Sequence, residues 1–374
     1  MQKLKKTKVV HINVPSDKRL IFVSDIHADL DTFKEGLDKV GFSNDDYLFI
    51  LGDIYEKGNL GENLKMIRYI MELSKLENVY IQTGNCDEVL RMCYPPVIDK
   101  NKFLYFIIEK QKSILNDMAA ELNIEICKDM DIDSFMNSCI NEYKEIFDFI
   151  DNLPDVYFIN DTLVTVHAGI TDIYNIDEHA MNVLKYDRFY ELSNIQPKIM
   201  LVGHYPTRNY RPNLASANPI FDFNKRIISI DGGNHVVKGG QINFVVLNSL
   251  DSMQFDYIYS DHYPKHIMKY DVRYDVKAQT SITYGQNEVV IVERDLDFYY
   301  VKHLNTNTLM WIYKNNVYYN DKENKYYAYD GTNNFLSVNK GDEISICIKA
   351  NPFSLIKKDG IIGLIETKYL DYEV

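Results

Sequence analysis

The chain has 374 residues, of which 46% are hydrophobic and 13% aromatic, and this composition excludes disordered, collagen-like and coiled-coil classes. Its 41 basic and 54 acidic residues give a net charge of −13, which disfavours a protein that binds nucleic-acid phosphates through its overall charge. No apolar run reaches the roughly 18 residues of a membrane span. The five cysteines include no CxxC pair, which argues against a disulfide framework or a thiolate zinc site. We therefore expect a cytoplasmic protein of two or three domains.

The first part of the chain alternates short apolar runs with stretches of helical periodicity. This alternation predicts a largely parallel sheet whose strands are joined by helices. The expected strands are 20–23, 47–51 and 79–81, and the expected helices run from Leu30 to Val40 and through Leu64, Ile67 and Met71. The predicted unit is therefore β-α-β-α-β.

The middle of the chain divides into a helical part and a β-rich part. Residues from about 99 to 150 carry long helical patterns and predict a helical cap within a first domain that spans residues 1–250. Residues 155–247 are rich in strand signals, and the Asn160-Asp161 pair predicts a hairpin turn. The four strands expected here are 156–159, 162–166, 199–202 and 227–230.

The last part, residues 251–374, has dense tyrosine and phenylalanine, frequent turns and no long helical pattern, which predicts a separate all-β region. A weak internal repeat runs through it. Residues 287–292 match 342–347 and residues 298–302 match 353–357, both at a shift of 55, and residues 310–312 match 363–365 at a shift of 53. The repeat predicts two tandem small barrels, at about 272–320 and 327–374.

Polar segments follow five of the predicted strands, at the end of the sheet where ligands collect in open α/β folds. Taken singly, such residues are most often helix caps, core histidines or turns. Together they offer carboxylate, amide and imidazole ligands suited to two metal ions, with Asp53 bridging. We expect the first ion to be held by Asp25 and His27 with Asp53, and the second by Asn85, His167 and His204 with Asp53.

These segments resemble the motifs of the calcineurin-like metallophosphoesterase superfamily, and specifically its phosphoprotein-phosphatase (serine/threonine protein phosphatase) branch. The resemblance covers residues 19–248. It rests on Asp25-Ile-His27-Ala28, Gly52-Asp53-Ile-Tyr-Glu56-Lys57-Gly58, Gly84-Asn85-Cys86-Asp87, His167-Ala-Gly169 and Gly203-His204-Tyr205, with further similarity at Leu153-Pro154, Ile230-Asp231-Gly232-Gly233 and Gly239-Gly240-Gln241.

The resemblance implies an α/β fold, a four-layer sandwich of two mixed sheets flanked by helices, to which the C-terminal all-β region is added. It also implies two divalent metal ions, with manganese expected first and iron or zinc as alternatives, and attack on phosphorus by a hydroxide held between them. The substrate would be a phosphorylated protein or a small phosphate ester or nucleotide.

The sequence departs from that branch at the candidate catalytic residues Cys86, Asp87, Glu56 and Lys57. Cys86 stands where the branch has the histidine that protonates the leaving group, and losing general-acid help typically costs about 10²–10⁴ in rate. Glu56 and Lys57 stand where the branch has Asp and Arg, and Lys lacks the bidentate fork of Arg. The candidate substrate-binding residues are Arg91, Arg188 and Arg208.

Two other functions stay open. The Asn-Cys-Asp variant is similar to phosphodiesterase-type members, so a phosphodiesterase or a nucleotide or dinucleoside polyphosphate hydrolase is one alternative to a protein phosphatase. A phosphate-recognising binding module with little turnover is the other. The C-terminal region weakly resembles Src-homology-type small barrels, over about residues 272–372, and this resemblance implies a peptide or protein partner. A structural or dimerising role is the alternative for that region.

Overall fold

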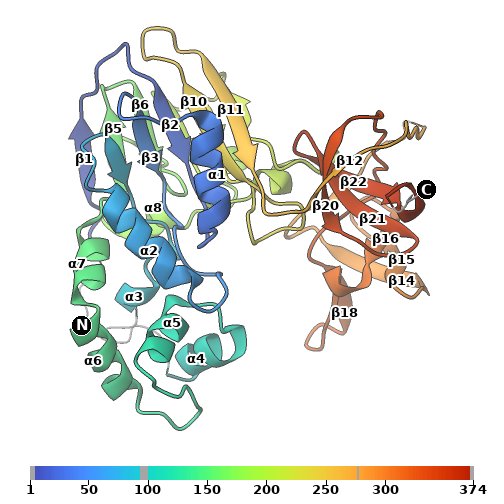
Figure 1. Cartoon of the computed structure of the whole chain (residues 1–374), viewed down its shortest axis with the longest axis horizontal. Coiled ribbons are helices and arrows are strands. Elements are labelled where there is room, and N and C mark those ends of the chain that lie inside the picture. Colours follow the sequence, from blue (N-terminus) through green and yellow to red (C-terminus); the bar gives the residue numbers. More distant parts are fainter. Residues whose placement is uncertain (1–4, 93–99, 276–277, 371–374) are drawn as a thin grey trace. The chain divides into compact units, whose positions relative to one another are not determined.

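The computed structural model describes residues 5–92, 100–275 and 278–370. The chain forms two compact units (Figure 1). By their residue ranges, the chain passes between them five times. Unit 1 comprises residues 1–205, 219–231 and 242–260, and unit 2 comprises residues 206–218, 232–241 and 261–374. Segments 206–218 and 232–241 thus leave unit 1, take part in unit 2 and return. The division expected after residue 250 falls between two strands that pair within unit 1, β10 (Ile242–Leu247) and β11 (Phe255–Ser260).

One sheet of unit 1 contains the predicted β-α-β-α-β unit. Strands β2 (Leu20–Val23), β3 (Tyr47–Ile50) and β4 (Val79–Ile81) are parallel neighbours, and β10 and β11 extend the sheet in antiparallel fashion beside β2. The connecting helices are α1 (Leu30–Val40) and α2 (Glu62–Leu73). Both helices were expected from their apolar periodicity, and both pack that face against the sheet.

The second sheet of unit 1 has six strands in the order β1-β5-β6-β7-β9-β8. Their bounds are β1 (Val9–Ile12), β5 (Val156–Ile159), β6 (Leu163–Val166), β7 (Ile199–Val202), β8 (Ile220–Asp222) and β9 (Ile227–Ser229). β5 and β6 form the predicted antiparallel hairpin, and Asn160 and Asp161 at its turn both have positive φ, at 46° and 56°. Positive φ at both central residues is the geometry of a tight hairpin turn, so the prediction is confirmed.

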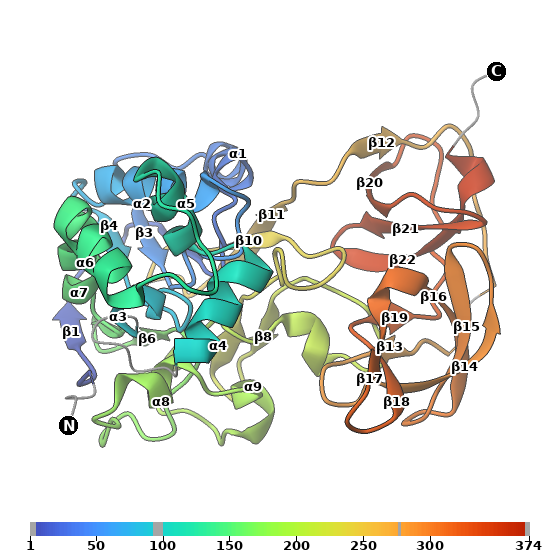
Figure 2. The ribbon, with the colours of Figure 1, turned by 90° about the horizontal axis from the view of Figure 1, so that it is seen from below.

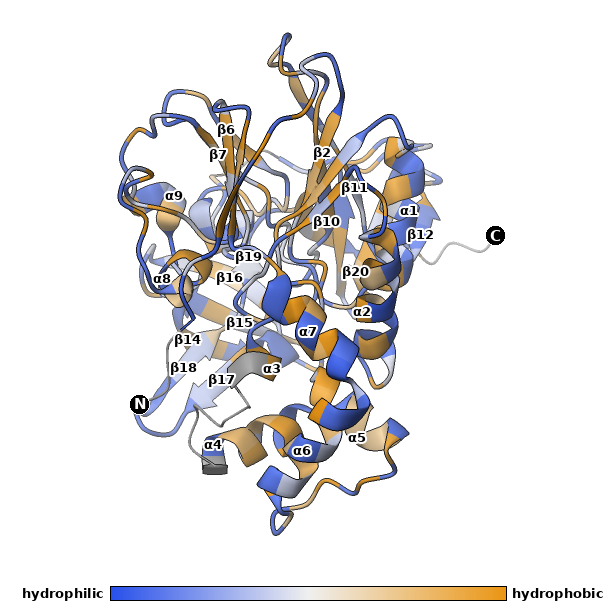
Figure 3. Ribbon diagram, turned by 90° about the vertical axis from the view of Figure 1, so that its left-hand side faces the viewer, coloured by the Kyte–Doolittle hydropathy of each residue, from blue (hydrophilic) through white to orange (hydrophobic). Residues whose placement is uncertain are grey.

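Side chains of the two sheets alternate between two cores. In β2, Leu20 and Phe22 face the other sheet, while Ile21 and Val23 face α1 and α2. The outer face of the six-stranded sheet packs against α8 (Ala180–Leu184) and α9 (Phe189–Leu192). Figure 3 shows α8 and α9 beside β6 and β7, and α1 beside β10 and β11. The predicted fold class, two mixed sheets flanked by helices, is confirmed.

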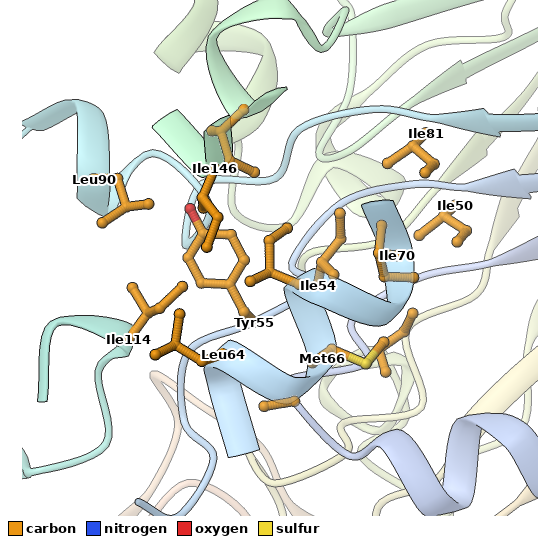
Figure 4. Packing of buried hydrophobic residues seen from close by; sticks show 14 of the residues in the cluster. Ile50, Ile54, Tyr55, Leu64, Met66, Ile70, Ile81, Leu90, Ile114 and Ile146 are labelled. Atoms are coloured by element: carbon orange, nitrogen blue, oxygen red, sulfur yellow. The ribbon is translucent and has the colours of Figure 1, made fainter. Parts of the chain in front are cut away.

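The segment expected to be helical holds most of the remaining helices of unit 1 (Figure 2). α3 (Val89–Met92) precedes this segment. Its own helices are α4 (Lys100–Tyr105), a π-helical turn at Phe106–Lys110, α5 (Ile114–Glu121), α6 (Ile132–Glu142) and α7 (Lys144–Asn152). They share one core with α2 and the five-stranded sheet. Figure 4 shows Tyr55 of the loop after β3 among Leu64, Leu90, Ile114 and Ile146, so this loop is packed against the helical segment.

Unit 2 is built from strands, with short 3₁₀ turns at Thr207–Tyr210, Lys314–Asn316 and Thr367–Tyr369. Its larger sheets have the orders β16-β15-β14-β18-β17 and β12-β20-β21-β22, and β13 pairs with β19. The bounds are β12 (Lys265–Ile267), β13 (Ser281–Ile282), β14 (Glu288–Arg294), β15 (Phe298–His303), β16 (Thr308–Tyr313), β17 (Val317–Asn320), β18 (Lys325–Ala328), β19 (Gly331–Thr332), β20 (Glu343–Ile348), β21 (Phe353–Lys358) and β22 (Ile361–Glu366).

The same three-strand antiparallel arrangement occurs twice in unit 2, as β14-β15-β16 and as β20-β21-β22. Each copy carries a β-bulge in its first strand, between Ile291 and Glu293 in one and between Ile346 and Ile348 in the other. The two bulges are 55 residues apart, which is the shift of the sequence repeat. The copies do not close as separate tandem pieces, because β12 joins the later sheet and β18 joins the earlier one.

Candidate metal centre

The candidate ligands lie in loops that directly follow β2, β3, β4, β6 and β7, as the strand-end rule predicts. Left-handed backbone is concentrated in these loops. Non-glycine residues there with positive φ are Asp25, His27, Ala28, Asp53, Glu56, Lys57 and His204. Such conformations cost of order 1–3 kcal/mol each and persist where the surroundings enforce them, typically at functional sites.

Two glycines allow the loops to approach one another. A Cβ on Gly84 would lie 2.3 Å from Asp53 Oδ1 and 2.9 Å from the His167 ring, and a Cβ on Gly203 would lie 2.4 Å from Asp25 Oδ2. No other residue type fits these positions without moving a candidate ligand. Glycine before Asn85 and before His204 is therefore required by close packing at the centre.

His167 is fixed in one tautomer by the backbone. Its Nδ1 lies 2.8 Å from the carbonyl oxygen of Leu51, which only accepts, so Nδ1 carries the proton and donates. Nε2 is then the atom with a free lone pair, and it lies 3.3 Å from Asp53 Oδ1 and 3.2 Å from Asn85 Oδ1. Three electron-pair donors thus face one another with no proton between them, which is the arrangement that a cation stabilises.

On the other side of Asp53, His27 Nε2 lies 3.8 Å from Asp53 Oδ2 and 3.9 Å from Asp25 Oδ1. Lys57 Nζ lies 2.9 Å from the same nitrogen. Among the described residues, Asp53 belongs to two groups whose possible ligand atoms all lie within 4.8 Å of one another, one with Asp25 and His167 and one with His27 and Cys86. Asp53 is therefore the residue that the two groups share.

His204 makes two hydrogen bonds near the centre, one from its backbone N–H to Asp25 and one from its ring to Asp187. Its N–H donates to Asp25 Oδ2 at 3.0 Å, and its Nε2 lies 2.8 Å from Asp187 Oδ1. Because the carboxylate accepts, Nε2 is the protonated nitrogen and Nδ1 keeps the lone pair. Burial and the neighbouring His167 lower the pKa of His204 to about 4, so the ring is neutral at pH 7.

The buried carboxylates at the centre have opposite pKa shifts. Burial, followed by the charge of Asp53, raises the pKa of Asp25 to about 7. Burial also acts to raise the pKa of Asp53, but His167, His27 and Lys57 together outweigh it and hold this pKa below its ordinary value. The bridging candidate is therefore the carboxylate that stays ionised most readily.

Two of the candidate catalytic residues, Cys86 and Asp87, support the metal centre through hydrogen bonds that involve the backbone. The backbone N–H of Cys86 donates to Asp53 Oδ1 at 2.8 Å, and burial raises the pKa of the Cys86 thiol well above its ordinary value, so the thiol is neutral. Asp87 is buried and accepts from the N–H groups of Gly84 at 2.8 Å and Ile54 at 2.9 Å. Asp87 thereby holds together the loops that carry Asp53 and Asn85.

The Glu56 carboxylate is hydrogen-bonded to the helical segment. Its Oε1 accepts from Ser113 Oγ at 2.9 Å and from the backbone N–H of Ile114 at 2.8 Å. Burial raises the pKa of Glu56 to about 8. These contacts give Glu56 the role of a helix cap for α5.

The three candidate arginines lie in different surroundings. Arg208 belongs to unit 2, is 1% exposed and donates to the carbonyl oxygens of Lys238 at 3.0 Å and Gly331 at 3.2 Å. This burial argues against the predicted substrate-binding role. Arg188 is half exposed, follows Asp187 directly and pairs with Glu191 at 2.6 Å, so it stays a candidate. Arg91 lies in α3, and its side chain is outside the described residues.

The groups that orient the ligands were not predicted from the sequence. Asp187 and the carbonyl oxygen of Leu51 were not identified, and nor was the connection of Glu56 to Ser113 and Ile114. A carbonyl oxygen carries no sequence signal, and Asp187 lies in a loop without a recognised motif. The acid directly before Arg188 was the one available signal, since charged loop residues near a histidine often orient its ring.

The profile of the calcineurin-like phosphoesterase family matches residues 18–352. The chain belongs to this family. It is a metallophosphoesterase, a hydrolase of phosphoric esters, and the family assignment confirms the superfamily resemblance expected from the motifs. The match also extends beyond residue 248, where the sequence resemblance ended. Comparison with curated proteins finds no match.

Solved structures similar to this metallophosphoesterase share 13–16% sequence identity with it. A protein provisionally assigned as a diadenosine tetraphosphatase has 16% identity and a TM-score of 0.41, over 68% of this chain and 99% of that one. A serine/threonine phosphatase from Saccharomyces cerevisiae has 13% identity and a TM-score of 0.39, over 70% of this chain and 85% of that one. A metallophosphoesterase from Sphaerobacter thermophilus has 14% identity and a TM-score of 0.37, over 65% of this chain and 88% of that one. Scores this low support no inference about the substrate.

Within the described ranges of the chain, no helix is both long enough and apolar enough to cross a bilayer.

Proposed function

We propose that the chain hydrolyses phosphate esters at a dinuclear centre in which Asp53 bridges two divalent ions, with manganese expected first. Asp25 and His27 would hold one ion, and Asn85, His167 and His204 the other. The observation that carries the proposal is the position of His167 Nε2, which lies 3.3 Å from Asp53 Oδ1 and 3.2 Å from Asn85 Oδ1, with the ring proton directed away to Leu51. Such a set of mixed oxygen and nitrogen donors suits manganese, iron or zinc.

Bound ions would supply Lewis-acid stabilisation of the phosphoryl group and a nucleophile from water at neutral pH. The residues of the chain have separate roles around them. Neutral His167 and His204 keep a lone pair for ligation, because their other ring nitrogen donates to Leu51 and Asp187. Asp87 holds the loops together, and Lys57 supplies the positive charge that a phosphate group requires.

The geometry favours substrates whose leaving group needs little protonation. The Cys86 thiol is a weak proton donor, because burial raises its pKa well above the ordinary value. A serine alkoxide is a poor leaving group and depends most on general-acid help. Of the substrates left open by the sequence, we therefore favour phosphodiesters and nucleotide polyphosphates over phosphoserine proteins.

The test is hydrolysis of para-nitrophenyl phosphate and bis-para-nitrophenyl phosphate by metal-stripped protein, with Mn²⁺, Zn²⁺ or Mg²⁺ added back. We expect metal-dependent turnover that Asp53→Asn abolishes and that Asp45→Asn, at an exposed position, leaves unchanged. The ratio of the two rates distinguishes a monoesterase from a diesterase. Undiminished activity of Asp53→Asn would overturn the site assignment. No turnover with any metal, in protein that binds two metal equivalents, would favour the phosphate-binding module.

A further inference from the structure

Lys57 is a cation inside the candidate metal centre. Its ammonium lies 2.9 Å from His27 Nε2, and the carboxylates of Asp53, Asp25 and Asp231 interact with its charge. Three carboxylates near one another repel unless a positive charge lies among them. Lys57 supplies this charge on the His27 side of the centre.

The ammonium and a metal ion require the same atom. An ammonium only donates hydrogen bonds, so the short contact uses the lone pair of His27 Nε2. A cation held by Asp25, His27 and Asp53 needs that same lone pair, since Nε2 is the ring atom that faces both carboxylates, at 3.9 and 3.8 Å. We propose that Lys57 is a built-in competitor for the first metal ion, an inference that rests on the proposed dinuclear centre.

The backbone at Lys57 restricts how it leaves. Lys57 has φ of 70° and donates its N–H to the carbonyl oxygen of Lys112 at 2.8 Å, and the preceding Glu56 is held by Ser113 and Ile114. The Cα is therefore fixed, and the ammonium leaves His27 by rotation of its flexible four-carbon stem. A phosphate group bound at the centre would receive the displaced ammonium.

The two halves of the centre consequently differ in their affinity for a metal ion. On the His167 side, Nε2 faces the oxygens of Asp53 and Asn85 and is ready for a cation. On the His27 side, a cation must first displace Lys57. Because phosphate accepts the displaced ammonium, phosphate binding and first-site metal binding favour each other, and this coupling is reciprocal.

The test is equilibrium dialysis of metal-stripped protein against Mn²⁺, with metal content measured by mass spectrometry. Wild type should bind one equivalent tightly and a second about tenfold or more weakly. In Lys57→Met, which keeps the length of the stem, the weaker equivalent should tighten by about tenfold. Lys65→Met, on the exposed face of α2, is the matched control and should bind as wild type does.

Two further measurements identify the weaker site and do not depend on the Lys57 variant folding. His27→Gln should remove the weaker equivalent and keep the tight one. Inorganic phosphate should tighten the weaker equivalent in wild type and have no such effect in Lys57→Met.

Unchanged or weaker binding by Lys57→Met would overturn the inference, as would two equally tight equivalents in wild type that phosphate does not affect. If the protein binds the tight and the weak Mn²⁺ equivalents as expected but hydrolyses no substrate, the proposed function alone would be overturned. Hydrolysis with Lys57→Met binding metal as wild type does would overturn this inference alone.

Discussion

Glu56, in the loop before α2, caps the start of α5, and Asp117 of α5 caps the start of α2. Glu56 precedes α2 and accepts from the N–H of Ile114 at the start of α5, at 2.8 Å. Asp117 belongs to α5 and accepts from the N–H groups of Gly61, at 2.7 Å, and Leu64, at 3.0 Å, at the start of α2. Each carboxylate therefore satisfies backbone donors that the other helix leaves free. This exchange fastens the loop that carries Lys57 to the helical segment.

Asp117→Ala should lower the free energy of unfolding by about 1–2 kcal/mol, the usual cost of losing a helix cap. Urea unfolding measures the change, and Asp129→Ala, at an exposed position, is the control. Full stability in Asp117→Ala would contradict the capping role.

Glu56→Gln should alter the pH dependence of stability. The folded-state pKa of Glu56 is raised to about 8 from an ordinary 4.5, mainly by burial, so the folded protein binds the extra proton between these values. Stability due to this group is then present at low pH and is lost as pH rises through 8. Glutamine keeps an accepting oxygen without the titration.

The difference in melting temperature, Glu56→Gln minus wild type, should therefore become more positive between pH 5 and pH 9. A difference that is constant over this range would show that Glu56 does not titrate as its burial implies. The exposed Glu35→Gln provides the control for a surface carboxylate.

Asp187→Asn should weaken binding of the metal ion held by His204 by about 10–100-fold, the usual effect of losing a group that orients a ligating histidine. The carboxylate is 55% exposed, so the free energy of unfolding should change little. Equilibrium dialysis and thermal unfolding of the metal-stripped variant test the two expectations separately. Loss of stability with unchanged metal affinity would assign Asp187 a structural role instead.

Cys86→His should raise hydrolysis of phosphomonoesters with poor leaving groups, because an imidazole can donate a proton near neutral pH. We expect a gain of about tenfold, below the roughly 10²–10⁴ of an established general acid, because Glu56 is held by Ser113 and Ile114 and cannot orient the new ring. The ratio of rates for phenyl and para-nitrophenyl phosphate provides the measurement. An equal gain for both substrates would point to a cause other than proton donation.

Arg208→Met should destabilise unit 2 by about 2–4 kcal/mol, because the carbonyl oxygens of Lys238 and Gly331 lose their buried donor. Thermal unfolding measures the stability, and KM for para-nitrophenyl phosphate measures substrate binding. A stable variant with a raised KM would restore the substrate-binding role that the sequence suggested for Arg208.

Much of the fold followed from local pattern. The strands and helices of the first β-α-β-α-β unit were predictable because a buried parallel strand is an apolar run and a surface helix has a 3.6-residue period. The hairpin at Asn160 and Asp161 was predictable because few residues tolerate positive φ. The passage of segments 206–218 and 232–241 into unit 2 was not predictable, because no local signal marks which strands a loop will join.

The sequence by itself determined the family and the candidate ligands, because a ligand must be a particular residue type at a strand end, and both features are written locally. Only the tertiary structure decided which groups orient those ligands. Glu56 lies 58 residues from Ile114, and His204 lies 17 residues from Asp187. A hydrogen bond at 2.8 Å depends on where two distant loops meet, and residue spacing along the chain does not contain that information.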